Sequence, residues 1–176
     1  YYPFWLAYAV GVAEKSGHNI RFYDAPAQRL SLNEIFNKLV DFIPDLVVLD
    51  TSTPSIYEDI KIADRIKEKF SKSFMLLVGT HPSALPEKTL ELSKFVDGIA
   101  VGEYDYIIRN LAEALQKNNN LDTVDGLVYR KDQKIIRNKP IEKIKNLDEI
   151  PFVSSVYKKY LNHKEYFFAA ASYPMM

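Results

Sequence analysis

Three apolar runs of the sequence end in small residues whose hydroxyl and amide groups could bind the polar edge of a ligand. The runs are Val-Val-Leu-Asp-Thr-Ser-Thr-Pro-Ser at 47–55, Met-Leu-Leu-Val-Gly-Thr-His-Pro-Ser-Ala at 75–84 and Gly-Ile-Ala-Val-Gly-Glu at 98–103. Glycine lets a flat or bulky ligand approach the backbone, and hydroxyl groups both donate and accept hydrogen bonds. The pattern predicts one binding site built from three segments. Its candidate residues are Thr51, Ser52, Thr53, Ser55, Gly79, Thr80, His81, Ser83, Gly102 and Glu103.

Several of these residues also have a simpler structural explanation. Ser55 could cap a helix, Gly79 could serve a turn, and Glu103 could begin a helix, where an acid interacts favourably with the helix dipole. His81 has no carboxylate or thiolate beside it in the sequence, so it is a weak metal signal and is interpreted as a loop or structural histidine. The sequence therefore assigns no catalytic residue and no metal ligand.

Alternating helices and strands are expected to position the three segments. The hydrophobic pattern predicts helices at 4–15, 31–43, 56–70, 86–95 and 106–117, and strands at 19–25, 46–49, 74–78 and 98–101. Such alternation predicts an α/β fold, a Rossmann-like doubly wound parallel sheet in which the carboxyl ends of the strands line a ligand crevice. A doubly wound unit normally has a strand before its first helix. The first strand is therefore expected to be missing, and the chain to be a fragment cut at both ends.

The pattern changes after residue 120. Residues 126–130 and 134–138 flank Lys131-Asp132-Gln133, which predicts a C-terminal β-hairpin. A charged connector follows at 140–151, and the aromatic segment 153–176 is too short to form a domain of its own.

Composition excludes several classes of function. Lys plus Arg and Asp plus Glu number 23 each, so the basic surface that nucleic-acid binding needs is not expected. No apolar run approaches the roughly 18 residues of a membrane span, and the first residues lack the pattern of a secretory signal. The chain has no cysteine, hence no disulfide and no cysteine metal site. The expected compartment is the cytoplasm.

Several short motifs occur in order along the chain. They are Gly17-His18, Asp24-Ala25, Pro44-Asp45-Leu46-Val47, Thr51-Ser52-Thr53-Pro54-Ser55, Gly79-Thr80-His81-Pro82-Ser83-Ala84-Leu85-Pro86-Glu87, Gly102-Glu103, Asp125-Gly126-Leu127-Val128-Tyr129-Arg130 and Asn146-Leu147-Asp148-Glu149-Ile150-Pro151-Phe152. This ordered set resembles the N-terminal cobalamin (B12)-binding domain of radical SAM enzymes. The resemblance implies a cobalamin-binding Rossmann-like domain at 1–120, a β-hairpin and connector at 121–152, and the start of a truncated radical SAM domain at 153–176.

The resemblance also implies what the candidate residues bind. In that family the corrin ring lies on the carboxyl edge of the sheet with cobalt facing the radical SAM barrel, and the segment at 51–55 contacts the nucleotide tail. The expected cofactor of this chain is cobalamin, and its expected protein partner is the barrel of the same enzyme. A 4Fe-4S cluster and S-adenosylmethionine are expected in the parent enzyme, outside this chain. The implied reaction there is methyl transfer or a related carbon-centre modification, and this fragment alone is not catalytic.

The sequence departs from the family pattern in two places. Many cobalamin domains carry an Asp-x-His-x-x-Gly loop whose histidine ligates cobalt, and neither His18 nor His81 lies in such a loop. The candidate residues would therefore hold cobalamin by its tail rather than by cobalt. The three-cysteine motif is also absent, and Tyr173-Pro174 stands where Cys-Pro is usual.

Two other functions remain open at this stage. A receiver-like signalling domain also has an acid at a strand end, here Asp50, and would bind magnesium in an acidic cluster. An enzyme of another kind, such as a nucleotide or glycosyl transferase, could use the same crevice. The sequence lacks a Gly-x-Gly-x-x-Gly or phosphate loop, which disfavours that alternative.

Overall fold

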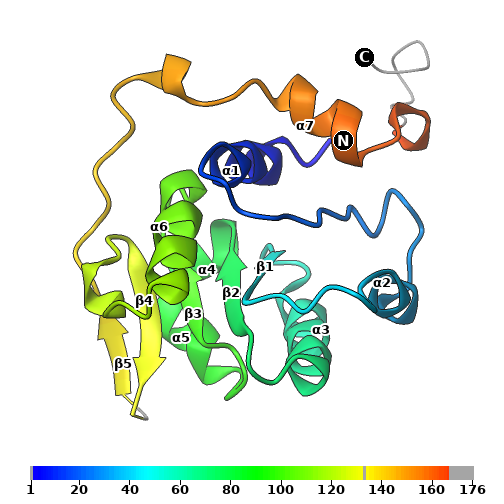
Figure 1. Ribbon diagram of the computed structural model, residues 1–176. Helices are drawn as coiled ribbons and strands as arrows, with labels where there is room; N and C mark the ends of the chain where they lie inside the picture. The colour runs from blue at the N-terminus through cyan, green and yellow to red at the C-terminus, as the bar shows by residue number, and fades with distance from the viewer. Residues whose placement is uncertain (1, 133, 167–176) are drawn as a thin grey trace. The chain divides into compact units, whose positions relative to one another are not determined.

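The computed structural model describes residues 2–132 and 134–166 (Figure 1). The chain divides into two compact units. Ile43–Ile144 form the first, called here the sheet unit, which contains all ten candidate site residues. Tyr1–Phe42 and Lys145–Met176 form the second, called the helical unit.

The sheet unit is built on one five-stranded sheet in the order β1-β2-β3-β4-β5. Three parallel strands come first, β1 (Leu46–Asp50), β2 (Phe74–Val78) and β3 (Gly98–Ala100). The predicted hairpin, β4 (Leu127–Lys131) and β5 (Lys134–Arg137), extends the same sheet in antiparallel fashion. The expected α/β class is confirmed, and the hairpin is part of the sheet.

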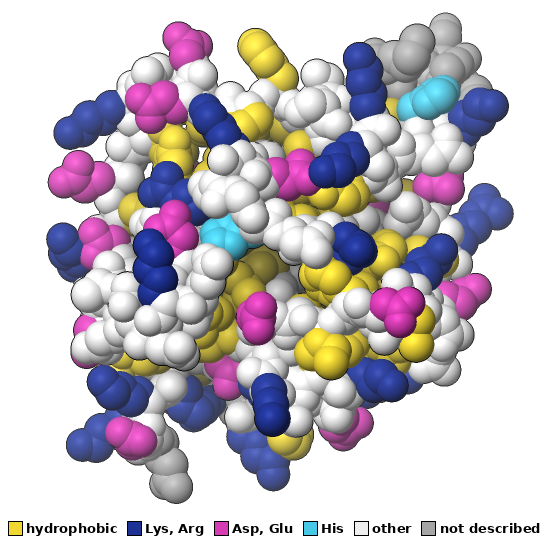
Figure 2. All heavy atoms as spheres, viewed as in Figure 1, with side chains coloured by type: hydrophobic (Ala, Val, Ile, Leu, Met, Phe, Trp, Pro, Cys, Tyr) yellow, Lys and Arg dark blue, Asp and Glu magenta, His cyan; other side chains and the backbone are white. Residues whose placement is uncertain are grey.

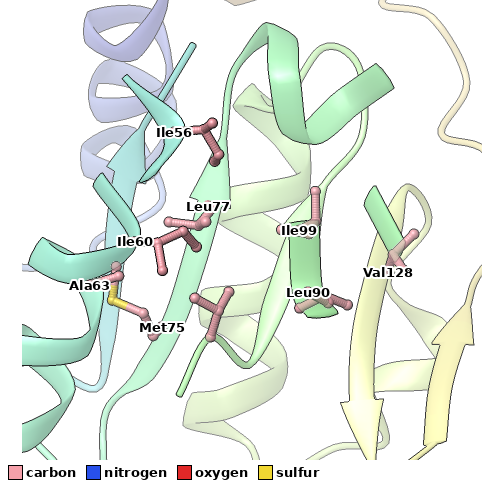
Figure 3. Packing of buried hydrophobic residues seen from close by; sticks show 9 residues of the cluster. Ile56, Ile60, Ala63, Met75, Leu77, Leu90, Ile99 and Val128 are labelled. Atoms are coloured by element: carbon pink, nitrogen blue, oxygen red, sulfur yellow. The ribbon is translucent and has the colours of Figure 1, made fainter. Parts of the chain in front are cut away.

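The helices of the sheet unit bury apolar residues. They are α3 (Ile56–Lys69), α4 (Thr80–Ala84), α5 (Pro86–Glu91) and α6 (Asp105–Gln116), followed by a 3-10 turn at Leu121–Thr123. Side chains of α3 and α5 pack against alternate residues of β2, β3 and β4 (Figure 3). This buried cluster consists of Ile56, Ile60, Ala63, Met75, Leu77, Leu90, Val96, Ile99 and Val128. It holds the strands in place below the carboxyl edge of the sheet.

The helical unit contains α1 (Phe4–Lys15), α2 (Leu32–Lys38) and α7 (Val153–Tyr160), with 3-10 turns at Leu147–Glu149 and His163–Glu165. A capping box begins α2, since the Ser31 amide donates to Glu34 and the Glu34 amide donates to the Ser31 hydroxyl. The helices α1 and α7 are joined by Glu14, which accepts hydrogen bonds from Lys159 and Tyr160.

One predicted strand is wrong. Asn19–Ala25 has no regular structure, and the following residues form turns. The alternation of Ile20 and Phe22 correctly marks the side that is buried, because Phe22 packs in the core of the helical unit. A strand also needs a neighbour for its backbone groups, and within the described residues this segment pairs with no strand. The backbone of Asp24 and Ala25 instead accepts local bonds from Gln28 and Leu30.

The pattern also missed two helices. No helix was predicted at Thr80–Ala84, which forms α4, or in the aromatic segment after Pro151, which begins with α7. The predicted functional boundaries at residues 120 and 152 stay predictions. Tyr173-Pro174 lies outside the described residues.

Charged side chains of both signs are mixed on the face of the molecule seen in Figure 2. Figure 2 shows Lys and Arg side chains interspersed with Asp and Glu over the face in view, in line with their equal numbers. Within residues 2–132 and 134–166, no helix is long and apolar enough to cross a membrane.

Candidate functional site

The three predicted segments meet at one edge of the sheet because their strands are parallel and adjacent. Asp50 pairs with Val78 at the ends of β1 and β2, and the Thr51 amide donates to the Val78 carbonyl at 2.9 Å. β3 lies on the other side of β2 and leads into Gly102 and Glu103. All ten candidate residues therefore follow the carboxyl ends of three neighbouring strands.

The first segment, Thr51–Ser55, combines one buried and several accessible hydroxyl groups. Thr51 is 4% exposed, and its hydroxyl donates to Asp59 in α3 at 2.5 Å, so this residue anchors the loop to the helix. Ser52 and Thr53 are exposed. The hydroxyls of Ser52 and Ser55 lie 3.1 Å apart, and Ser55 makes no side-chain capping bond to α3. Ser55 thus shapes the turn, and the expected capping role is not observed.

The second segment begins at Gly79, where no other residue fits. Gly79 has φ +112°, a backbone conformation that favours glycine. A Cβ atom placed there would lie 2.2 Å from the Thr51 carbonyl oxygen and 2.5 Å from Oδ1 of Asp50. The glycine therefore allows the ends of β1 and β2 to approach closely. Its role goes beyond that of a turn glycine, which needs only the positive φ.

Residues of α4 tie the three segments together. Nδ1 of His81 lies 3.2 Å from the Thr53 hydroxyl, which links the second segment to the first. The Ser83 hydroxyl accepts a hydrogen bond from the Gly102 amide at 3.0 Å, which links it to the third. Thr80 is exposed at the start of the helix. Within the described part of the chain, no group of three or more His, Cys, Asp or Glu residues could hold a metal ion.

The third segment is open. Gly102 has φ +89°, and a Cβ atom placed there would meet nothing within 4 Å. Gly102 and Glu103 border a cavity of about 310 Å³ between the end of β3 and the hairpin. The cavity is lined by Val101, Gly102, Glu103, Gly126, Val128, Arg137, Asn138, Pro140, Ile141 and Lys143. The glycine therefore leaves room beside the third strand.

Three acidic or phenolic side chains near this edge were missed as site residues. Partial burial raises the pKa of Asp50, although the residue keeps exposed surface, and the Asp59 charge adds to the effect. Tyr104 is 8% exposed, and burial followed by the charges of Asp50 and Asp105 raises the pKa of its phenol. Burial and the Glu103 charge also raise the pKa of Asp105. The place of Asp50 as the last residue of β1 was a signal that could have identified it, whereas Tyr104 and Asp105 lie at the start of α6, where no local pattern marks their burial.

The fold is that of an α/β domain whose ten candidate site residues lie at the carboxyl ends of its parallel strands. A family model described as the B12 binding domain matches residues 1–112, well over half of the chain. The chain belongs to the B12-binding domain family.

Longer proteins contain a related segment. A protein of Pyrococcus horikoshii named as an uncharacterized methyltransferase is 28% identical over 152 residues, which cover 86% of this chain and 33% of the relative. The anaerobic magnesium-protoporphyrin IX monomethyl ester cyclase of Cereibacter sphaeroides is 30% identical over 155 residues, which cover 84% of this chain and 25% of the relative. The chain thus spans a quarter to a third of these relatives.

Two solved structures have a similar fold. The radical S-adenosylmethionine methyltransferase TsrM of Kitasatospora setae, solved with cobalamin and a 4Fe-4S cluster, matches with a TM-score of 0.70 at 17% identity. The match covers 85% of this chain and 28% of TsrM. The cobalamin-dependent S-adenosylmethionine radical enzyme OxsB matches with a TM-score of 0.69 at 22% identity, over 82% of this chain and 21% of OxsB. The expected Rossmann-like fold is confirmed by these likenesses.

Proposed function

We propose that this chain binds cobalamin at the carboxyl edge of β1, β2 and β3 and presents it to the catalytic domain of a radical SAM enzyme. The observation that carries the proposal is the convergence of Thr51–Ser55, Gly79–Ser83 and Gly102–Glu103 at one edge, in a chain of the B12-binding family. Ligands of open α/β sheets bind at this edge, outside the carboxyl ends of the strands.

The residues at the edge fit the chemistry of cobalamin. The space above Gly102 is open, so a large ring system can approach the backbone there. Exposed hydroxyls at Ser52 and Thr53 can bond the amide groups that surround the corrin ring or the edge of its nucleotide tail. His81 is held by Thr53 and lies outside any Asp-x-His-x-x-Gly loop, which favours binding through the tail.

The residues of this chain bind and orient the cofactor. Cobalamin, when bound, supplies the cobalt-centred group-transfer chemistry. The small hydroxyl residues fix the position of the tail, and the buried core below the edge excludes water from one side of it. The chain contains no cysteine, so it contributes no cysteine ligand to an iron-sulfur cluster. In this proposal the cluster and S-adenosylmethionine belong to the parent enzyme.

The reaction of the whole enzyme is proposed to be methyl transfer or a related modification of a carbon centre. One relative is named a methyltransferase, and another is named a cyclase that acts on a porphyrin ester. TsrM is described as a methyltransferase. These names support carbon-centred chemistry. In this proposal the substrate binds to the part of the parent enzyme outside this chain.

A receiver-like function finds less support. Receiver domains bind magnesium in an acidic cluster beside the strand-end aspartate. Here the charge of Asp59 raises the pKa of Asp50, but the Asp59 carboxylate accepts a hydrogen bond from the Thr51 hydroxyl. The described residues contain no group of acids able to hold a metal ion.

Titration of the chain with hydroxocobalamin tests the proposal. We expect saturable binding with a shifted visible spectrum, and retention of the cofactor through gel filtration. A chain of native stability that leaves the hydroxocobalamin spectrum unchanged at high protein concentration contradicts the proposed function. Magnesium-dependent phosphorylation of Asp50 by a small phosphoryl donor would support the receiver alternative instead.

A further inference from the structure

Ser83 connects two of the three segments that make up the proposed site. It lies in α4, which contacts β2 and β3, and its hydroxyl accepts a hydrogen bond from the Gly102 amide at 3.0 Å. Gly102 follows the end of β3, so this bond ties the third segment to the second. Ser83 was predicted as a residue that contacts the ligand, and the observed bond gives it a contact of another kind.

Gly102 depends on this bond for a defined conformation. Its backbone has φ +89°, and a Cβ atom at this position would meet nothing within 4 Å. In the part of the chain that the structure describes, the bond to Ser83 is the only hydrogen bond that Gly102 makes. Glycine has more backbone freedom than any other residue, so ordering it costs the most conformational entropy. Without the Ser83 hydroxyl, Gly102 would therefore sample several conformations.

An ordered Gly102 is an advantage for the proposed ligand. Its N–H is already used by Ser83, so what Gly102 offers a ligand is space next to the backbone. Gly102 also borders the cavity of about 310 Å³ beside the third strand. In the proposed function a large ring system approaches the backbone at this position. A site that is ordered before the ligand arrives loses less entropy on binding.

The helix α4 is held in place by contacts other than the Ser83 hydroxyl. It has five residues, little more than one turn, and a single turn is not stable in isolation. Pro82 is buried, and Nδ1 of His81 lies 3.2 Å from the Thr53 hydroxyl. Removal of the Ser83 hydroxyl should therefore release Gly102 without unfolding α4.

We propose that Ser83 is a positioning residue of the cobalamin site, which orders Gly102 through its hydroxyl before the cofactor binds. This inference rests on the proposed cobalamin function. It assigns Ser83 an effect that acts through another residue, in place of the direct contact with the ligand that was predicted from the sequence.

Positioning and direct contact predict different binding kinetics. If Ser83 orders Gly102, its loss lowers the fraction of chains that are ready to bind, and the association rate falls by that fraction. The bound state keeps its contacts, so the dissociation rate changes little. If Ser83 contacts the cofactor directly, its loss weakens the bound state, and the dissociation rate rises.

The first measurement needs no cofactor. Amide hydrogen exchange of the full chain is followed by NMR in wild type and in Ser83→Ala. We expect the Gly102 amide to exchange about tenfold faster in the variant, as for one lost hydrogen bond. The Val101 amide, which donates to the Gly126 carbonyl at 2.9 Å, is the internal control and should keep its rate.

The second measurement is stopped-flow mixing of the full chain with hydroxocobalamin. Ser83→Ala should lower the association rate about fivefold to tenfold and leave the dissociation rate within about twofold of wild type. Ser83→Thr keeps the hydroxyl and should restore both the association rate and the slow exchange of the Gly102 amide. Ser71→Ala removes an exposed hydroxyl from the turn before β2 and is the matched control that should behave like wild type.

The outcomes separate the two proposals. A wild-type chain that binds no hydroxocobalamin contradicts the proposed function itself. Binding by wild type with an unchanged association rate in Ser83→Ala overturns the positioning role alone. A loss of affinity that lies wholly in the dissociation rate also overturns it and makes Ser83 a direct contact. Unchanged exchange of the Gly102 amide in Ser83→Ala overturns it without any cofactor.

Discussion

The Asp50 carboxylate occupies the space beside β2 that a side chain at residue 79 would need, with Oδ1 only 2.5 Å from the position of a Cβ atom on Gly79. The Thr51 carbonyl oxygen lies closer still, at 2.2 Å. The ends of β1 and β2 can thus lie this close only because residue 79 has no side chain. The geometry of the edge depends on this glycine.

Gly79→Ala should therefore destabilise the sheet unit by at least about 2–3 kcal/mol, because a left-handed backbone strain is added to a backbone clash. Urea denaturation measures the change. Gly102→Ala is the matched control, with φ +89° and nothing within 4 Å of its Cβ, so it should cost only the strain of about 1 kcal/mol. Equal losses in the two variants would show that the close approach of β1 and β2 is not the cause.

The buried hydroxyl of Thr51 gives a second prediction. Thr51→Val keeps the shape of the side chain but removes the 2.5 Å bond to Asp59, and we expect a loss of about 1.5–3 kcal/mol in the free energy of unfolding. Thr53→Val, on an exposed residue of the same loop, should change it by less than about 0.5 kcal/mol. If Thr51→Val costs as much in an Asp59→Ala background, which lacks the acceptor, as in wild type, the two side chains are not coupled.

The pH dependence of stability should report Asp50 and Asp105. Burial raises the pKa of both carboxyls, so the folded chain binds their protons more tightly than the unfolded chain. The stabilisation from these protons is complete below the ordinary value of 3.8 and is lost as the pH rises through the raised pKa values. The double variant Asp50→Asn, Asp105→Asn should gain in Tm relative to wild type as the pH rises through this window. A Tm difference that is constant with pH, as expected for the control Asp45→Asn, contradicts this assignment.

A partly buried ion pair at the opposite edge of the sheet gives a fourth prediction. Lys67 donates to Asp97 and to the Ser73 carbonyl, both at 2.5 Å, and the same Asp97 oxygen accepts the Met75 amide at 2.7 Å. Lys67→Met should cost about 2–3 kcal/mol, because it leaves a shielded carboxylate without its cation.

Lys61→Met is the control for the ion pair. It breaks the 2.6 Å ion pair between Lys61 and Glu58, whose side chains are 68% and 73% exposed respectively. The variant should lower the free energy of unfolding by less than about 0.5 kcal/mol. Comparable unfolding free energies for the two variants would mean that the Lys67 network adds no more than a surface pair.

The fifth prediction concerns cobalt. His81 lies 3.2 Å from the Thr53 hydroxyl and is expected to position the loop and not to ligate cobalt. His81→Ala should therefore leave the visible band positions of bound hydroxocobalamin unchanged, with at most a severalfold loss of affinity. A shift of those bands in the variant, absent from a Thr53→Ala control, would identify His81 as a cobalt ligand.

Much of the sheet could be predicted because burial on both faces leaves a continuous apolar run. Phe74–Val78 was predicted with the observed bounds for this reason, and the capping box of Ser31 and Glu34 marked a helix start. Asn19–Ala25 failed because alternation reports which side is buried and says nothing of a pairing partner. Local patterns of this kind cannot identify a strand on their own.

The candidate site was predicted only in part. Parallel strands bring their carboxyl ends together, so the three segments were expected to meet, and Ser83 and His81 do link them. Tyr104 escaped notice because it stands between two acids, Glu103 and Asp105, where the pattern suggests an exposed helix start. Its burial depends on the packing of α6, which no local pattern contains.

The antiparallel pairing of β3 with β4 bears on how the protein is best produced. β3 has only three residues, and Gly98, Ile99 and Ala100 pair with Tyr129, Val128 and Leu127 of the hairpin. A recombinant chain that stops at residue 120 would bare the hydrogen-bonding edge of β3 and remove Val128 from the buried cluster. Such an exposed apolar edge invites aggregation. Expression of the sheet unit should therefore extend to Ile144, the last residue of that unit.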